Sequence, residues 1–334
     1  MHIPDGFLDA KTAAASAVLA AGGVAYALRT VRKELPARRV PLIGLTASFI
    51  FVAQMLNFPV AGGTSGHLIG ATLAAVLLGP GAAIVVMTAV LLLQSLLFAD
   101  GGLTALGANI FNMAIVAPIV GFAMYSAIRR LGARSEGASA WRWKLFGTAF
   151  GAWCSTLAAA IACAGQLAFS GTVAWNAALP AMGGVHMLIG IGEATITTLV
   201  VAGVARSRPE LLEAADRSGP ATPAAHARDA LVYGLLLCAG LALFVAPFAS
   251  GWPDGLEKVA SRLGFEHRAT TTIETPLSDY GVAGLNSSYL ATAIAGLAGA
   301  ALAFAIAFLL ARVFAPHIEP AREANTPRTR EDQP

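Results

Sequence analysis

The sequence predicts an all-α integral membrane protein, in which a bundle of about seven helices is followed by a two-helix module with an extracytoplasmic loop. Three observations support this fold class. Hydrophobic residues make up 56% of the chain and charged residues only 12%, against about 25% charge in soluble domains. The mean hydropathy is +0.67. Apolar runs of about 20 residues, the length that a membrane-spanning helix needs, recur along the whole chain.

Clusters of proline, glycine and charged residues divide the apolar runs into candidate spans. In chain order these spans are 9–30, 41–58, 67–79, 81–98, 107–128, 143–169, 184–205, 230–249 and 286–313. The third and fourth are short and are divided by Gly79-Pro80-Gly81. They could therefore be two half-spans or two tilted helices.

The basic residues indicate which side of the membrane each end of the chain occupies. If the N-terminus lies outside and every candidate span crosses, the outer side keeps only four of the 22 basic residues, Lys11, Lys258, Arg262 and Arg268. The others fall on the inner side, as the positive-inside rule requires. We therefore expect a bacterial cytoplasmic membrane protein with its N-terminus outside and its C-terminus inside.

Composition divides the chain into a first membrane domain, a cytoplasmic linker, a two-span module and a tail, at 1–206, 207–229, 230–315 and 316–334. The linker is polar and rich in proline, and the charged tail is predicted to be disordered. An outer loop at 251–285 separates the last two spans. Within it Leu256, Val259 and Leu263 have helical spacing, which predicts a short amphipathic helix.

The first residues do not resemble a signal peptide, because Asp5 and Asp9 precede the first apolar run. We therefore expect the mature protein to begin at Met1. The terminal amine, the backbone nitrogen of His2 and the His2 imidazole can bind one divalent metal ion through fused five- and six-membered rings. Square-planar nitrogen sites favour Cu(II) or Ni(II). All these ligands must lose protons, so capture should weaken in acid.

One further ligand position stays open, and His67 in NFPVAGGTSGHLIGA (57–71) is the candidate for it. The predicted topology places this loop on the outer side with residue 1. Small residues spaced by four would let the terminus approach closely, namely Gly62, Gly66 and Gly70. Thr64 or Ser65 could cap the next helix and fix the ring. A histidine at position 2 alone is more typical of a frayed terminus, whereas an ionisable group near the membrane interior is typical of a functional site.

Three segments carry a resemblance to a known family. The opening MHIPDGFL, the loop NFPVAGGTSGHLIG and the later HMLIGIGEA (186–194) resemble the CbiM/NikM family. Members are the substrate-capture components of energy-coupling-factor importers for cobalt and nickel. The resemblance covers residues 1 to about 206 and implies a metal held by the Met1 amine, the amide and imidazole of His2, and His67. The stretch WPDGLEKVASRLGFE (252–266) is similar to the NikN/CbiN-type partner, and its PDGLE signature favours nickel over cobalt.

Several other polar residues lie within the spans. His186 and Glu193 are seven residues apart and share a helix face. They could orient a ligand or guard the access path, or they could form a buried helix-to-helix pair. Other polar residues are expected to bond neighbouring helices, namely Gln54, Gln94, Asn109 and Asn112. The two asparagines, near an outer end, could instead bond the metal loop. His267 in the outer loop is expected to be solvated.

The sequence also limits the function class. It holds no GxxxxGK[ST] stretch, so transport would need separate ATP-binding subunits and a coupling membrane subunit. We expect no enzyme activity, no cofactor and no nucleic-acid partner, with Ni²⁺ or Co²⁺ as the cargo. The alternatives are a cobalt importer subunit that feeds cobalamin synthesis, and a stand-alone secondary transporter. A stand-alone secondary transporter should carry charges within its spans. The spans of this chain hold almost none, and Glu193 is the notable exception. Without CxxC spacing, the three cysteines read as buried apolar residues.

Overall fold

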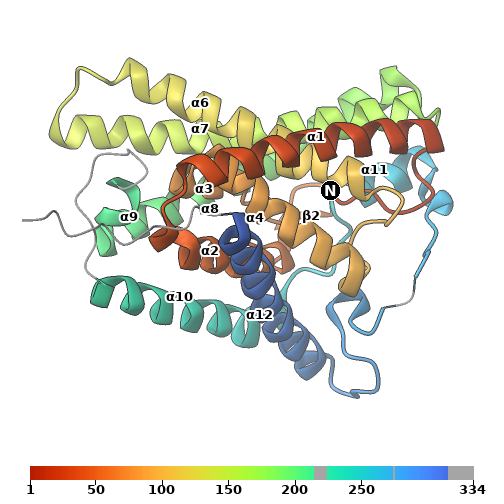
Figure 1. Ribbon diagram of the computed structural model, residues 1–334. Helices are drawn as coiled ribbons and strands as arrows, with labels where there is room; N and C mark the ends of the chain where they lie inside the picture. Colours follow the sequence, from red (N-terminus) through yellow and green to blue (C-terminus); the bar gives the residue numbers. More distant parts are fainter. Residues whose placement is uncertain (214–223, 274, 315–334) are drawn as a thin grey trace, which may run out of the picture.

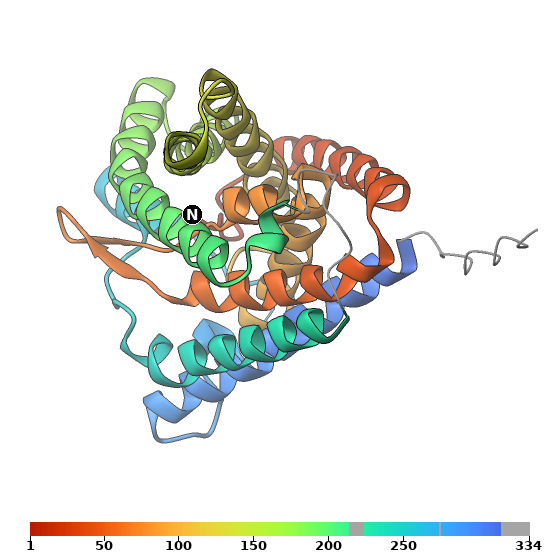
Figure 2. The same cartoon turned by 90° about the vertical axis from the view of Figure 1, so that its left-hand side faces the viewer.

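The computed structural model describes residues 1–213, 224–273 and 275–314. Within these ranges the chain is a bundle of helices, and its first residue lies inside the bundle (Figures 1 and 2). The longer helices are α1 (Ala10–Glu34), α2 (Val40–Met55), α4 (Pro80–Leu93), α6 (Ala117–Leu131), α7 (Gly137–Phe169), α8 (Trp175–Ser207), α10 (Ala224–Phe244) and α12 (Ser288–Phe314). The shorter elements are η1 (Ala37–Arg39), β1 (Phe58–Val60), β2 (Thr64–Gly66), α3 (Ala71–Leu78), η2 (Gln94–Phe98), α5 (Leu106–Asn109), η3 (Ile110–Val116), α9 (Pro209–Glu213), η5 (Ala246–Phe248), α11 (Gly255–Leu263), η6 (Glu266–Arg268) and η7 (Ser278–Tyr280).

The helix lengths confirm the predicted all-α membrane class. Seven helical segments among the described residues are long and apolar enough to cross a membrane. The π-helical turns η2 and η3 continue α4 and join α5 to α6, so each of these segments counts as one candidate span. The helix α2 is also apolar but has only 16 residues.

The predicted helical span at 67–79 is wrong as a complete helix. Only α3 is helical there, and its eight residues extend about 12 Å, far less than the roughly 30 Å of a bilayer core. Residues 67–70 before it have no regular secondary structure. The α3–α4 turn at Gly79 lines a cavity with Glu34 at the far end of α1. The segment therefore connects the two ends of the bundle as a short irregular strip followed by a half-helix.

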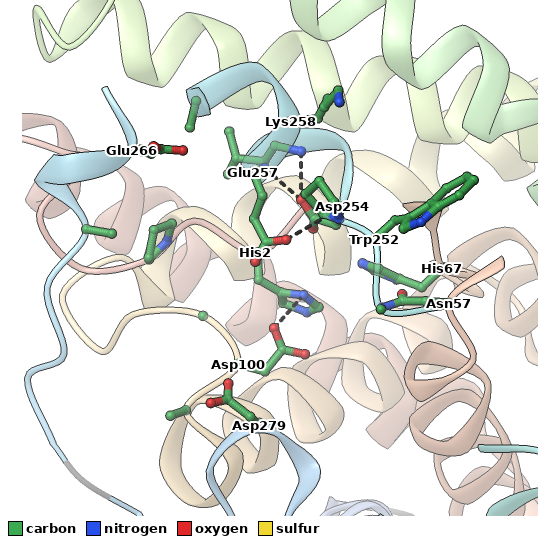
Figure 3. A pocket seen from close by; sticks show the side chains of 18 of the residues that line it. His2, Asn57, His67, Asp100, Trp252, Asp254, Glu257, Lys258, Glu266 and Asp279 are labelled. Carbon is green, nitrogen blue, oxygen red and sulfur yellow. Dashed lines mark hydrogen bonds and ion pairs between the residues drawn. The ribbon is translucent and has the colours of Figure 1, made fainter. Parts of the chain in front are cut away.

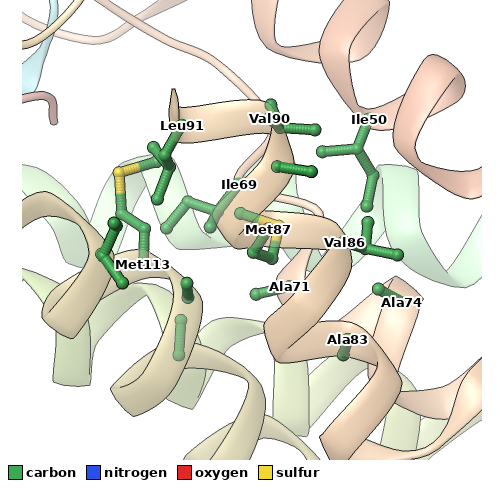
Figure 4. Packing of buried hydrophobic residues seen from close by; sticks show 14 of the residues in the cluster. Ile50, Ile69, Ala71, Ala74, Ala83, Val86, Met87, Val90, Leu91 and Met113 are labelled. Carbon is green, nitrogen blue, oxygen red and sulfur yellow. The ribbon is translucent and has the colours of Figure 1, made fainter. Parts of the chain in front are cut away.

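Irregular backbone inside a membrane needs hydrogen-bond partners from the protein itself. The N–H groups of Ile69 and Gly70 donate to the two carboxylate oxygens of Glu193, at 2.6 and 2.9 Å. The side-chain amide of Gln54 donates to the Ile69 carbonyl at 2.8 Å. Ile69 itself packs among Ile50 and Met87 in the apolar core (Figure 4). The broken span is therefore satisfied by buried polar groups of α8 and α2.

A β-hairpin precedes this strip and projects from the bundle (Figure 2). Its strands pair antiparallel, with Phe58 opposite Gly66. The expected small-residue stripe is wrong, because its three glycines lie in different elements: Gly66 ends β2, and Gly70 is the N-cap residue of α3. Gly62 lies instead in the hairpin turn with a φ of +80°. Gly66 still allows close packing, since a Cβ there would lie 2.7 Å from the side chain of Ile189.

The last two spans pack directly against the first module. Along α12, a Cβ at Gly299 would lie 2.1 Å from the ring of Phe51 in α2. On α10, Gly234 faces Leu45 of α2 in the same way. The predicted amphipathic helix in the outer loop is confirmed as α11, which buries Leu256 and Val259.

The described residues of the predicted linker at 207–229 are largely helical. Helix α8 runs to Ser207, α9 follows it, and α10 already begins at Ala224. Residues 214–223 and the predicted disordered tail lie outside the described residues. Cys163 and Cys238 are buried free thiols, as expected, while Cys154 is half-buried.

Candidate metal centre

The N-terminal segment runs back into the bundle, where other parts of the chain form hydrogen bonds with the backbone of this segment. Asp9 caps α1 by accepting a hydrogen bond from the Thr12 N–H. Further back, Asn109 holds Ile3 on both sides. Its side-chain oxygen accepts from the Ile3 N–H at 2.8 Å, and its amide donates to the Ile3 carbonyl at 3.0 Å. Met1 and Ile3 are consequently 4% and 0% exposed, which is unusual for a chain end.

Asp5 fixes the next part of this segment. Its carboxylate accepts from the backbone N–H of Thr104 at 2.7 Å and from the Thr104 hydroxyl at 2.5 Å. Burial alone would raise the pKa of Asp5, but the Thr104 bonds lower it overall. The Asp5 carbonyl accepts from the N–H of Thr270 in the second module. Both modules therefore hold the terminal segment.

The terminal amine and the two predicted histidines meet at the end of this segment. The Met1 nitrogen lies 3.2 Å from Nε2 of His67. The other ring nitrogen of His67 lies 3.1 Å from the Leu68 carbonyl, to which it donates when Nε2 is the acceptor. The rings of His2 and His67 stack with centroids 5.3 Å apart.

Two carboxylates that the sequence analysis did not single out complete the cluster. Asp100 accepts from Nδ1 of His2 at 3.0 Å, and the hydroxyl of Tyr280 donates to Asp100 at 2.5 Å. Asp254 forms an ion pair with the terminal amine. Burial alone would raise both carboxyl pKa values, but the His2 ring beside Asp100 and the amine beside Asp254 hold them well below their usual range. Burial would lower the pKa of the amine, but Asp254 raises it overall.

His2, His67, Asp100 and Asp254 line a cavity of about 850 Å³ (Figure 3). Nε2 of His2 is buried there without a hydrogen-bond partner among the described residues. Buried polar atoms are rarely left unpaired, and each such atom calls for an explanation. The cluster therefore offers an amine, two imidazoles and two flanking carboxylates, a set of groups that suits a divalent transition metal. Among the described residues, no three His, Cys, Asp or Glu side chains are by themselves gathered to hold a metal.

The remaining predicted site residues lie around this centre in different roles. Ser65 caps no helix: its hydroxyl donates to the Trp252 carbonyl at 2.7 Å, and α3 has Gly70 as its N-cap residue and no side-chain cap. Glu193 binds the strip after His67. The expected helix-to-helix pair is therefore not formed, because the Nδ1–H of His186 donates to the Met182 carbonyl.

The other predicted polar residues also differ in what they bond. Asn109 bonds the terminal segment, while Asn112 donates to Gln166 of α7 at 2.7 Å and acts between helices. Gln94 donates to the hydroxyl of Tyr280. His267 is exposed, as expected.

Comparison with known proteins identifies the family. Residues 2–211 match the CbiM family, described as the cobalt uptake substrate-specific transmembrane region, and residues 228–316 match the PDGLE domain. A protein of Archaeoglobus fulgidus, whose name describes a fused nickel transport protein NikMN, is 37% identical over 93% of this chain and 98% of its own length. The fused nickel transport protein NikMN of Rhodobacter capsulatus is 32% identical over 90% of this chain and 94% of its own.

A solved structure supports the same assignment. The crystal structure of a truncated transition metal transporter is 37% identical to this chain, with a TM-score of 0.55 over 62% of this chain and 99% of its own. The names of these relatives describe transporters rather than enzymes. The chain described here therefore belongs to the CbiM family of membrane metal transport proteins and carries a PDGLE domain fused behind its CbiM region.

Proposed function

We propose that this chain captures Ni²⁺ at its own N-terminus and serves as the substrate-specific component of an energy-coupling-factor importer. One observation carries this proposal. The Met1 amine is buried in the bundle 3.2 Å from Nε2 of His67, which is buried as well. A buried chain end beside a buried imidazole has little structural value, but the two nitrogens suit a metal ion that prefers nitrogen ligands.

The ligand set is the amine of Met1, the amide and imidazole of His2, and Nε2 of His67. The six-membered chelate ring of His2 uses Nδ1, which now lies against Asp100. Capture therefore includes a rotation of the His2 side chain, in which the metal replaces Asp100 at Nδ1. Asp100 then remains near the metal as a counter-charge, which matters because an unpaired charge in the protein interior is costly.

Nickel is favoured over cobalt by two observations. The PDGLE domain is fused to this chain, and two relatives that match it over at least 90% of its length bear the name of nickel transport proteins. A planar set of nitrogen donors also suits Ni(II). Cobalt is the second candidate, because the family description names cobalt uptake and a cobalt transport protein CbiM of Pelobacter propionicus is 43% identical over 132 residues.

The sequence supports the proposed coupling partners. Without a phosphate-binding GxxxxGK[ST] stretch, the chain needs ATP-binding subunits and a coupling membrane subunit to drive uptake. The basic residues support an N-terminus outside the cytoplasmic membrane, so the centre would take its metal from the outer side. A stand-alone carrier would instead continue to take up metal in cells that lack the ATP-binding partner.

The test is nickel uptake in cells that contain the partner subunits. A permanent N-terminal extension replaces the amine by an amide, and His67→Gln removes the imidazole. We expect both changes to abolish uptake, while His267→Gln, at an exposed histidine of the outer loop, leaves it intact. Undiminished uptake by the extended chain would refute the proposed site. Competition between equal amounts of the two ions then decides between nickel and cobalt.

A further inference from the structure

The second module reaches the metal centre through Asp254, and this contact rests on two separate carboxylate oxygens. Oδ1 accepts from the backbone N–H groups of Leu256 and Glu257, at 2.7 and 2.9 Å, and so caps α11. The Glu257 side chain accepts in return from the Asp254 N–H at 2.8 Å, which completes a capping box. Oδ2 is thereby directed at the terminal amine of Met1.

The loop that carries Asp254 is also fixed to β2, the strand that directly precedes His67. The N–H of Ser65 donates to the Pro253 carbonyl at 2.8 Å, and its hydroxyl donates to the Trp252 carbonyl at 2.7 Å. Ser65 lies two residues before His67, and Pro253 directly precedes Asp254. These bonds set the distance between the carboxylate and the imidazole, and the amine lies between them.

We propose that Asp254 is a positioning residue for metal capture, which holds the terminal amine beside His67 both before and after the metal arrives. This proposal rests on the function proposed above. A primary amine that donates its lone pair to a metal keeps two N–H groups, so it can still donate to Asp254. The arrangement parallels the carboxylates that orient metal-binding histidines through their second nitrogen. The negative charge also balances part of the charge of a buried divalent cation.

A purely structural role for Asp254 would be the capping of α11, and one substitution separates the two roles. Asparagine caps helices about as well as aspartate, so Asp254→Asn keeps the cap and removes the charge that faces the amine. Asp254→Ala removes both. Asp229→Asn is the matched control, because Asp229 is an exposed aspartate of α10 and is not among the residues that line this cavity.

The experiment uses the purified full-length chain and NiCl₂ as the probe. Nickel affinity is measured by titration calorimetry, and the rate at which the metal-free N-terminus reacts with an acylating reagent is followed by mass spectrometry of the first peptide. We expect Asp254→Asn to weaken nickel binding about 10–100-fold, the usual loss when a partner of a metal ligand is removed. The same variant should label faster at Met1, with an unchanged thermal midpoint. Asp229→Asn should match the wild type in all three measurements.

The outcomes distinguish this inference from the proposed function. If Asp254→Asn binds nickel and labels at Met1 as the wild type does, while Asp254→Ala lowers the thermal midpoint, Asp254 is only a helix cap and the inference is overturned. The nickel site itself would then stand. If the wild-type chain binds no nickel, the proposed function fails and this inference fails with it.

Discussion

Glu193→Ala tests whether the broken span positions the metal ligand. In the wild type, its carboxylate accepts from two buried backbone N–H groups, those of Ile69 and Gly70, at 2.6 and 2.9 Å. A buried donor left without a partner costs about 1–3 kcal/mol, so the two together cost about 2–6 kcal/mol if the strip does not move. No water is available within a bilayer to replace the carboxylate. The strip is therefore expected to rearrange, and His67, two residues away, moves with it.

The assay measures nickel affinity by titration calorimetry and stability by thermal unfolding of the purified chain. We expect Glu193→Ala to weaken nickel binding about 10–100-fold, in the range seen when groups that orient metal ligands are removed, and to lower the unfolding midpoint. Glu193→Gln keeps one acceptor oxygen and replaces the other by an amide that cannot accept. Its effect should fall between those of alanine and the wild type.

Thr197→Val provides the control on the same helix. Thr197 lies one turn after Glu193, is 0% exposed, and its hydroxyl has no hydrogen-bond partner among the described residues. Replacing that hydroxyl by a methyl group of similar shape should leave both measurements near the wild-type values. The reasoning is refuted if Glu193→Ala binds nickel as tightly as the wild type, or if Thr197→Val is as damaging as Glu193→Ala.

Three further predictions concern the terminus and the second module. Asn109→Ala removes both side-chain bonds to the Ile3 backbone, so nickel affinity in the same calorimetric assay should fall at least tenfold; an unchanged affinity would mean that the terminus is held elsewhere. Gly255→Ala places a Cβ 2.7 Å from the His186 ring, which should lower the thermal midpoint, whereas Gly251→Ala, with nothing within 4 Å, should not. The pKa of the Met1 amine is raised, so nickel must displace a proton from this amine when it binds. Nickel affinity should therefore rise about tenfold or more per pH unit between pH 6 and 8. An affinity that does not change with pH would exclude the amine as a ligand.

The sequence predicts the helical part of the fold well because membrane burial imposes a simple rule. A run of apolar residues long enough to cross the bilayer must satisfy its own backbone, and a helix does so. The exception is 67–70, which is apolar enough to read as helix but is held open by Glu193 and Gln54 from other segments. Such a break depends on contacts with residues 15 and 124 positions away, so local patterns do not reveal it.

The residues of the candidate metal centre likewise fall into those that the sequence predicts and those that it does not. Met1, His2 and His67 are predictable because their chemistry is visible in the chain itself and in its family resemblance. Asp100 and Asp254 are not, since aspartate next to glycine is also the usual composition of a turn or a helix cap. Asp254 indeed caps a helix, and only the packing of the second module against the first directs its other oxygen to the amine.

A chain end is normally the most mobile part of a protein, and this mobility explains why the centre is built from both modules. Ordering each residue costs about 1–2 kcal/mol of backbone entropy, and a metal that had to order a free terminus would bind more weakly by that amount. Here the cost is met before capture: Asn109 holds Ile3, Thr270 holds Asp5, and Phe7 packs edge-on against Phe265 of the second module. A chelate whose backbone is already placed keeps more of its intrinsic affinity. A first module without these second-module contacts would therefore have to recover the same order from a separate partner chain or bind nickel less tightly.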